Sequence, residues 1–217
     1  MGDRRAAFFD IDGTLLSVHT APLYARYLYR MGEARKRDLL RTLFHMVQYR
    51  LNQLDLETAL TRAGDLIAGR SETEEAERAA AWYRQQIRQY LVPEICARLE
   101  GHRKNGDMVA LLTTTTPYLA LPLAKDLGVE HVLATRLEVR DGYFTGRAIG
   151  PICYGKGKLV WARRFARERG IDLGASYFYT DSITDLPVLE SVGHPRVVRP
   201  DLLLARESRR RGWPVLG

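Results

Sequence analysis

The sequence predicts an α/β protein with a doubly wound, mainly parallel sheet and an all-helical insertion after the first strand. Three short apolar runs, at residues 6–9, 108–112 and 177–180, are each followed by polar residues and then by a helical pattern. Such alternation is typical of parallel strands joined by helices. From about residue 19 to residue 105, apolar residues recur at helical spacing and no strand pattern is convincing, which predicts the insertion.

The chain of 217 residues is long enough for one substantial core and a smaller inserted domain. We expect residues 1–17 and 100–217 to form the core, and residues 18–99 to form the helical insertion. Apolar residues at helical spacing predict helices within residues 24–31 and 39–47, and another from Asp55 to Ile67 that ends at Gly69. A capping box of Ser71 and Glu74 predicts the start of a long helix that runs to Leu91. A further helix is expected to start at Pro93.

Composition disfavours several classes of protein. No apolar run approaches the roughly 18 residues that span a bilayer, and residues 1–5 lead into the first strand without the apolar segment of a signal peptide. Cys96 and Cys153 lack the spacing of metal ligands, which favours reduced structural thiols. We therefore expect a cytoplasmic protein with no membrane partner.

The formal net charge of +7 raises the alternative of a basic nucleic-acid-binding protein. The densest basic cluster, Arg206 and residues 209–211, is however interrupted by Glu207, and no basic stripe alternates with aromatic residues. A positive field also attracts phosphorylated metabolites. We expect a small phosphorylated metabolite as the partner, with nucleic acid disfavoured, and the sequence indicates no oligomeric state.

The first strand ends in two acids. Asp10 and Asp12 follow the apolar run, and Gly13 marks the turn where the chain leaves the strand. In extended backbone, residues i and i+2 point to the same side, so both carboxylates would face one site. Two acids this close need a cation or a proton between them, and carboxylate oxygens suit Mg²⁺. The alternative is a structural turn in which Asp12 bonds only to the backbone.

The second strand ends in hydroxyl groups. Residues 113–116 are all threonine, and Pro117 then begins a helix. Hydroxyls and helix N-terminal N–H groups together form an anion cradle, although the threonines could also only finish the strand, with Thr116 as an N-cap. Further along, Asp141 and Gly142 lie within an alternating segment and predict a small hairpin beside the main sheet.

Charged residues also stand at the start of two later helices. Lys156 and Lys158 lie where positive charge is unfavourable for the helix dipole, which indicates an anionic neighbour. Asp181 ends the strand at residues 177–180, and Asp185 lies in the turn or first helical turn that follows. Both acids could therefore face the same cation, although Asp185 could equally be an N-cap.

Together these four segments resemble the motifs of the haloacid dehalogenase superfamily, and in particular of its subfamily IB, the phosphoserine phosphatase-like hydrolases. The family signature D-x-D-G-T stands at residues 10–14, the Ser/Thr motif aligns with Thr113, and the D-x-x-x-D motif stands at Asp181 and Asp185. The motif lysine matches Lys158 better than the lysine two residues earlier, because Lys158 lies 23 residues before Asp181. The resemblance spans a Rossmann-like core from end to end.

The resemblance implies a magnesium-dependent phosphatase. Asp10 would be the nucleophile that forms an aspartyl phosphate and also binds Mg²⁺. Asp12 would be the general acid and base, with its carbonyl on the metal, while Asp181 would bind Mg²⁺ and Asp185 would support the metal and the lysine. The residues that would bind the phosphoryl group are Gly13, Thr113, Thr114 and Lys158, of which Lys158 would also pair with the nucleophile.

The helical insertion stands where this family has a type 1 cap, which would exclude water and select the substrate. His19 replaces the acid with which phosphoserine phosphatases bind the substrate's amino group, and their cap arginine would fall near Ala63, next to Arg62. We take His19 and Arg62 as candidate specificity residues, and their pattern disfavours L-phosphoserine. Histidinol phosphate or another small phosphate ester, and a phosphotransferase on the same fold, remain the alternatives.

Overall fold

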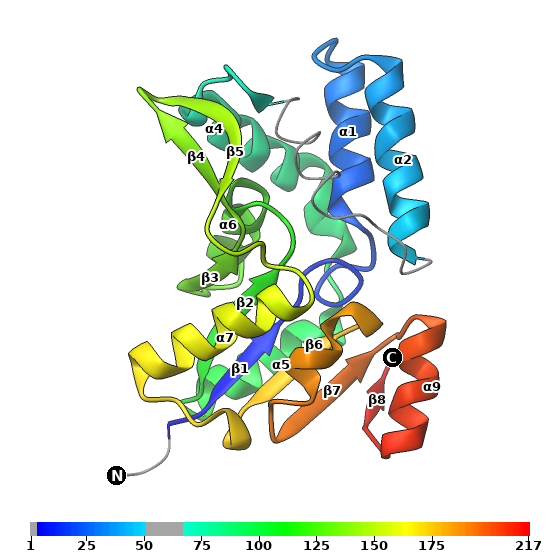
Figure 1. The fold of residues 1–217 in the computed structure, drawn as a ribbon, viewed down its shortest axis with the longest axis vertical. Helices are drawn as coiled ribbons and strands as arrows, with labels where there is room; N and C mark the ends of the chain where they lie inside the picture. The colour runs from blue at the N-terminus through cyan, green and yellow to red at the C-terminus, as the bar shows by residue number, and fades with distance from the viewer. Residues whose placement is uncertain (1–3, 51–66) are drawn as a thin grey trace.

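The structure, a computed structural model, describes residues 4–50 and 67–217, apart from the side chains of residues 45–47, 49 and 50. The helix expected from residue 55 to residue 67 lies outside the described residues except for its last residue. Six parallel strands form one sheet in the order β3-β2-β1-β6-β7-β8 (Figure 1). These strands are β1 (Ala6–Phe9), β2 (Met108–Thr113), β3 (His131–Ala134), β6 (Tyr177–Thr180), β7 (His194–Val198) and β8 (Val215–Leu216).

Strand β1 lies in the interior of the sheet, and its side chains belong to two separate core layers. Ala7 and Phe9 pack in one apolar cluster, whereas Ala6 and Phe8 pack in the other. All four are fully buried. An unbroken apolar strand is what a parallel sheet covered on both faces requires. The predicted fold class, a doubly wound α/β core with a mainly parallel sheet, is confirmed.

Helices cover both faces of this sheet. Leu99 of α5 and Leu123 of α6 join the cluster of Phe9. On the opposite face, Phe165 of α7 packs edge-to-face against Phe8, with the ring centroids 6.0 Å apart. The helices on the side of Phe9 are α5 (Pro93–Lys104) and α6 (Pro117–Asp126), and those on the side of Phe8 are α7 (Lys156–Arg169), α8 (Leu186–Leu189) and α9 (Leu202–Arg211).

The described part of the insertion is helical, as predicted, and lies beyond the carboxyl end of β1 (Figure 1). Ser71 caps its third described helix by accepting a hydrogen bond from the backbone N–H of Glu74 at 3.4 Å. The helices are α1 (Thr20–Arg30), α2 (Lys36–Arg50) and α4 (Glu72–Trp82). The domain limits at residues 17 and 99 stay a prediction.

The helix expected to run to Leu91 has a different course after α4. It widens into a π turn at Tyr83–Ile87 and then tightens into a 3₁₀ turn at Arg88–Tyr90. The wider turn accompanies the burial of two adjacent aromatic residues, Trp82 and Tyr83.

The predicted hairpin is present as β4 (Arg136–Arg140) and β5 (Tyr143–Ile149), which form a two-stranded antiparallel sheet of their own. Its turn residues, Asp141 and Gly142, have φ angles of 51° and 81°. Positive φ at both central positions is what a two-residue hairpin turn of type I′ requires.

The hairpin is bonded to the insertion through backbone groups. Gly69 N donates to Phe144 O at 2.8 Å, and Phe144 N donates to Arg70 O at 3.0 Å. Glu72 N also donates to Gly142 O at 2.9 Å. Residues 69–72, which precede α4, therefore lie along the edge of the hairpin and extend its small sheet.

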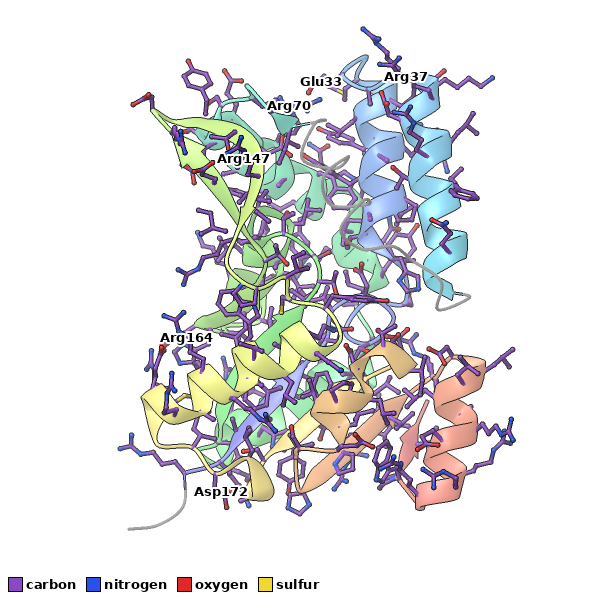
Figure 2. All side chains as sticks on the ribbon, viewed as in Figure 1. Glu33, Arg37, Arg70, Arg147, Arg164 and Asp172 are labelled. Carbon is purple, nitrogen blue, oxygen red and sulfur yellow. The ribbon has the colours of Figure 1, made fainter. Side chains whose placement is uncertain are left out.

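Positive charge is distributed over the molecule. Arg37, Arg147 and Arg164 lie on α2, β5 and α7, which are separate parts of the structure (Figure 2). In the insertion, Arg70 lies beside Glu33 and donates to its carboxylate at 3.2 Å. No helix in the described ranges is long and apolar enough to cross a membrane.

The burial of Leu99 generates a stability prediction. This side chain is 1% exposed, whereas Leu202 on α9 is 90% exposed. Leu99→Ala should lower the free energy of unfolding by about 2–5 kcal/mol, because it removes apolar contacts and leaves a cavity. Leu202→Ala, the matched control, should change it by less than about 0.5 kcal/mol. Urea unfolding of both variants measures the difference, and equal effects would contradict this assignment of the core.

Candidate active site

The site begins where β1 ends. Asp10 follows Phe9 directly and continues the alternation of Ala6 and Phe8, so its side chain belongs to the face that α7 covers. The carboxylate is 4% exposed, and its Oδ1 accepts a hydrogen bond from Ile11 N at 2.8 Å. Parallel sheets bind ligands beyond the carboxyl ends of their strands, and Asp10 stands at that edge.

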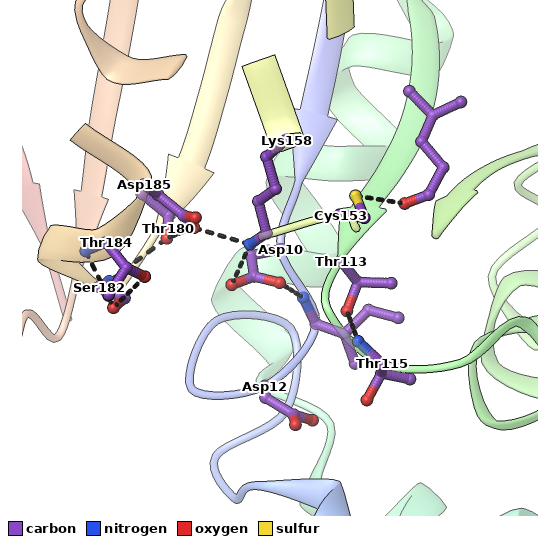
Figure 3. Close-up of polar contacts among 12 residues, drawn as sticks. Asp10, Asp12, Thr113, Thr115, Cys153, Lys158, Thr180, Ser182, Thr184 and Asp185 are labelled. Carbon is purple, nitrogen blue, oxygen red and sulfur yellow. Dashed lines mark hydrogen bonds and ion pairs between the residues drawn. The ribbon is translucent and has the colours of Figure 1, made fainter. Parts of the chain in front are cut away.

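Lys158 lies between two buried carboxylates. Its ammonium group is 3.0 Å from Asp10 Oδ2 and 2.7 Å from Asp185 Oδ2 (Figure 3). Thr180 Oγ1, at the end of β6, also donates to Asp185 Oδ2 at 2.6 Å. Lys158 and Asp185 are 1% and 0% exposed, so each charge depends on the others for compensation. The side chain of Asp185 is therefore occupied by these partners and makes no helix-capping bond.

The local backbone explains why Lys158 reaches this position. It is the third residue of α7, where its charge is unfavourable for the helix dipole and the two carboxylates offset that cost. A Cβ on Gly157 would lie 1.8 Å from Ile152 O, so only glycine permits this close approach of the backbone. Lys156, the other candidate, is exposed.

Asp12 lies on the loop after β1 and contacts the insertion. Its Oδ2 accepts a hydrogen bond from Thr20 Oγ1 at 2.9 Å, and Thr20 Oγ1 is also 2.8 Å from Thr115 Oγ1. Burial, together with the negative charge of Asp10, raises the pKa of Asp12 to about 7. A carboxyl group with a pKa near neutrality can both give and take a proton.

Asp181 lies directly against this loop. A Cβ on Gly13 would be 2.1 Å from Asp181 Oδ2, and Gly13 has a φ of 74°, so the approach requires glycine. Burial and the nearby charge of Asp10 raise the pKa of Asp181 well above its ordinary value. Burial likewise raises the pKa of Asp185 to about 6, although Lys158 opposes the shift.

Three of these acids have an oxygen that lacks a protein partner. Asp12 Oδ1, Asp181 Oδ1 and Asp185 Oδ1 are buried and accept no hydrogen bond from any described residue. Buried carboxylate oxygens are costly without a proton or a cation. Acids of this kind close to the end of β1 fit a divalent cation there.

Oxygen donors of this kind are compatible with a hard cation such as Mg²⁺. In the described ranges no three His, Cys, Asp or Glu side chains form a preassembled cluster. Mg²⁺ does not need one, because it keeps several waters and takes only one or two carboxylates together with substrate oxygens. Side chains of Asp10 and Asp181 and the carbonyl of Asp12 would meet that requirement.

The remaining predicted residues differ in how clearly the structure places them. Thr113 is buried at the end of β2, and its Oγ1 accepts a hydrogen bond from Thr115 N at 3.1 Å. Thr114 is half-buried in the same turn, and Thr116 stands at the N-cap of α6 without a capping bond from its side chain. His19 precedes α1 at the N-cap position. Arg62 lies outside the described residues.

Sequence reasoning missed three hydroxyl groups that hold the acids. Thr20 and Thr115 form the chain of hydroxyls at Asp12, and Thr180 bonds to Asp185. Threonines at strand ends and helix starts are common for local reasons. Nothing in their spacing distinguishes a threonine that bonds to a carboxylate of the site from one with a purely local role.

Cys153 lies beside the site but contributes no nucleophile. Its thiol is fully buried and donates to Leu133 O at 3.4 Å. Burial raises its pKa to about 12, so the thiol stays protonated. Cys96 is also a free thiol.

Comparison with known proteins places this geometry in a family. The family model of haloacid dehalogenase-like hydrolases matches residues 7–190. The chain belongs to the haloacid dehalogenase-like hydrolases. A histidinol-phosphatase of Neisseria meningitidis is 30% identical to this hydrolase over 223 residues, which cover 98% of each chain. A phosphoserine phosphatase of Mycobacterium tuberculosis is 33% identical over 214 residues, which cover 97% of this hydrolase and 70% of the relative.

A solved structure confirms the relationship at the level of the fold. The crystal structure of a protein of unknown function from Bordetella pertussis is similar over 99% of both chains, with a TM-score of 0.90 and 34% identity. The family match and the phosphatase relatives, rather than this structure, identify the hydrolase as a phosphoric monoester hydrolase of the phosphoserine phosphatase-like group.

The contrast between the two lysines gives a direct prediction. Lys158→Met should lower kcat for p-nitrophenyl phosphate by about 100-fold or more, because two buried carboxylates and the phosphate lose a preorganised positive charge. Lys156→Met, the matched control, should stay within about twofold of the parent. Steady-state kinetics on proteins with equal far-UV circular dichroism makes the comparison. Equal losses in both variants would contradict the assignment of Lys158.

The raised pKa values predict how the metal-free protein responds to pH. Because the pKa of Asp12 is about 7 in the fold, against an ordinary value of 3.8, the folded protein holds more protons than the unfolded chain between these values. The stability contributed by such acids therefore falls as pH rises through that window. In chelator, Asp181→Asn should raise Tm, and by more at pH 8 than at pH 5. A Tm difference that does not change with pH would contradict the raised pKa of Asp181.

Proposed function

We propose that this hydrolase is a magnesium-dependent phosphatase that cleaves a small-molecule phosphate monoester through an aspartyl phosphate on Asp10. The observation that carries the proposal is the ammonium group of Lys158, held within 3.0 Å of Asp10 and 2.7 Å of Asp185 at the edge of the sheet. Asp12, with its raised pKa, stands on the adjoining loop. A nucleophile, a positive charge and an acid–base group are therefore within one site.

In the first step, a carboxylate oxygen of Asp10 attacks phosphorus, and the bond from phosphorus to the ester oxygen breaks. The leaving alkoxide takes a proton from the carboxyl group of Asp12. Thr20 holds one oxygen of that carboxyl group at 2.9 Å, and the other, Oδ1, has no partner among the described residues and is the oxygen proposed to transfer the proton. Covalent attack of this kind divides a difficult displacement into two easier ones.

In the second step, water attacks the phosphorus of the aspartyl phosphate. Asp12, now ionised, accepts the proton of that water, and the bond between phosphorus and Asp10 breaks. The products are inorganic phosphate and the starting enzyme, with Asp12 protonated again. One residue serves both steps because its pKa of about 7 makes both protonation states accessible.

Charge on the transferring group needs compensation at its equatorial oxygens. Lys158 supplies one positive charge, while the hydroxyl of Thr113 and backbone N–H groups near Gly13 and Thr114 supply hydrogen bonds. Mg²⁺, when bound by Asp10, Asp181 and the carbonyl of Asp12, would neutralise phosphate charge and help to orient the ester. Asp185 would keep Lys158 in place.

The substrate is proposed to be a small phosphorylated metabolite. One relative is named a histidinol-phosphatase and another a phosphoserine phosphatase, so these two esters are the first to compare. His19 stands where the phosphoserine enzymes carry an acid for the substrate's amino group, which favours a substrate other than L-phosphoserine. The cytoplasmic location stays a prediction.

Substitution of the acid pair tests the proposal. Asp10→Asn should abolish turnover of p-nitrophenyl phosphate, because an amide cannot act as the nucleophile. Asp12→Ala should slow it by roughly 10²–10⁴-fold, the usual share of general acid–base catalysis. Asp141→Asn, in the exposed hairpin turn, is the matched control and should keep parental activity. Full activity of Asp10→Asn would overturn the mechanism.

Metal removal provides an independent arm of the same test. Chelation of divalent cations should stop hydrolysis, and added Mg²⁺ should restore it. Rates that do not change after chelation would remove the metal from the proposal while leaving Asp10 to be judged by its own variant.

A further inference from the structure

Arg199 binds the loop that carries Asp12. It follows β7, and its Nη2 donates to Gly13 O at 2.9 Å and to Thr14 O at 3.1 Å. The same nitrogen lies 3.5 Å from Leu16 O. One guanidinium group thus contacts three carbonyls of a loop that is more than 180 residues distant in the sequence.

Two features of Arg199 are energetically unfavourable: its backbone conformation and the burial of its Nε. Its φ of 38° lies in the left-handed region, where among described non-glycine residues only Asp141 joins it. Its Nε is buried and has no hydrogen-bond partner among the described groups. Such local cost persists where the surrounding structure determines the conformation, and it is most common near functional sites.

Asp201, two residues after Arg199, binds the loop that carries Asp181. Asp201 N donates to Asp181 O at 2.8 Å, and Asp201 Oδ2 accepts a hydrogen bond from Ile183 N at 2.8 Å. The remaining oxygen, Oδ1, accepts from Leu204 N at 2.8 Å and caps α9. Asp201 therefore holds the backbone on both sides of Ser182.

The two loops that Arg199 and Asp201 bind meet at the proposed metal site. Gly13 and Asp181 are in such close contact that a Cβ on the glycine would overlap the carboxylate. Arg199 holds the backbone at Gly13, and Asp201 holds the backbone at Asp181. The separation of the two loops is thus defined from one short segment, residues 199–201.

We propose that Arg199 is a positioning residue, which together with Asp201 clamps the Asp12 loop and the Asp181 loop at the separation that Mg²⁺ binding requires. The proposal rests on the proposed function, because it concerns the same metal. Groups that orient metal ligands without touching the metal commonly change metal affinity by 10–100-fold when removed. Arg199 and Asp201 stand in that relation to the carbonyl of Asp12 and the side chain of Asp181.

Three substitutions distinguish a role in positioning the two loops from a general contribution to folding stability. Arg199→Met removes the donors, and Arg199→Lys keeps the charge but cannot present the same planar donor group. Asp201→Ser keeps a good helix cap but has only one oxygen for its two present partners. Arg196→Met is the matched control, since Arg196 lies on β7, donates to the carbonyl of Pro195 and packs over the ring of Tyr177 rather than against either acidic loop.

The experiment measures the Mg²⁺ concentration that gives half-maximal hydrolysis of p-nitrophenyl phosphate, and the rise in Tm that Mg²⁺ causes without substrate. Arg199→Met should raise the half-saturating concentration by about 10-fold or more and reduce the Tm rise. KM for the ester at saturating Mg²⁺ should change by less than about threefold. Arg199→Lys and Asp201→Ser should show intermediate effects, and Arg196→Met should match the parent.

The outcomes are distinguishable from failure of the proposed function. If the parent protein shows no Mg²⁺-dependent hydrolysis, the proposed function fails and the clamp fails with it. If the parent depends on Mg²⁺ but Arg199→Met responds to Mg²⁺ as Arg196→Met does, the clamp is overturned and the phosphatase stands. A lower Tm with unchanged Mg²⁺ dependence also overturns it. Should Arg199→Met not fold, Arg199→Lys and Asp201→Ser decide by the same criterion.

Discussion

The ion pairs of Lys158 are the constraint on which the rest of the site depends. An ammonium group with almost no exposure can stay charged only beside negative partners, and Asp10 and Asp185 supply them at 3.0 and 2.7 Å. Asp10 directly follows β1 and Asp185 lies in the turn after β6, so β1 and β6 must be neighbours and α7 must cover the same face. The charge of Lys158 can therefore be compensated only because β1 and β6 are adjacent in the sheet.

The proposed Mg²⁺ would complete this charge balance. Four acids and one lysine meet at the strand ends, and three buried carboxylate oxygens have no partner among the described residues. Burial and mutual repulsion raise the pKa values of Asp12 and Asp181 for this reason. Under the proposed function, an arrangement that is unfavourable for the metal-free fold would favour the binding of Mg²⁺, a common trade between stability and activity.

Sequence patterns predicted much of the fold and the members of the candidate site because those features are local. The apolar runs of β1, β2 and β6, the Asp141-Gly142 turn and the acids at strand ends are all visible over a few residues. The strands β3 and β8 were missed, because both are short and partly exposed and their formation depends on the tertiary fold rather than on a local sequence pattern. Arg199 was missed because its partners are remote in the sequence, and Thr20 because a threonine near a helix start gives no local sign that it bonds to Asp12.

The bonds between the hairpin and residues 69–72 have a mechanical consequence. Any displacement of α4 that preserves them carries β4 and β5 along. The hairpin continues into residues 150–155, a segment that has a glycine at each end, with φ angles of 75° and 52°, and that leads straight into the first turn of α7. A shift of the helical insertion thus reaches the lysine by a covalent route, and the two glycines are the joints at which the chain can absorb or transmit it.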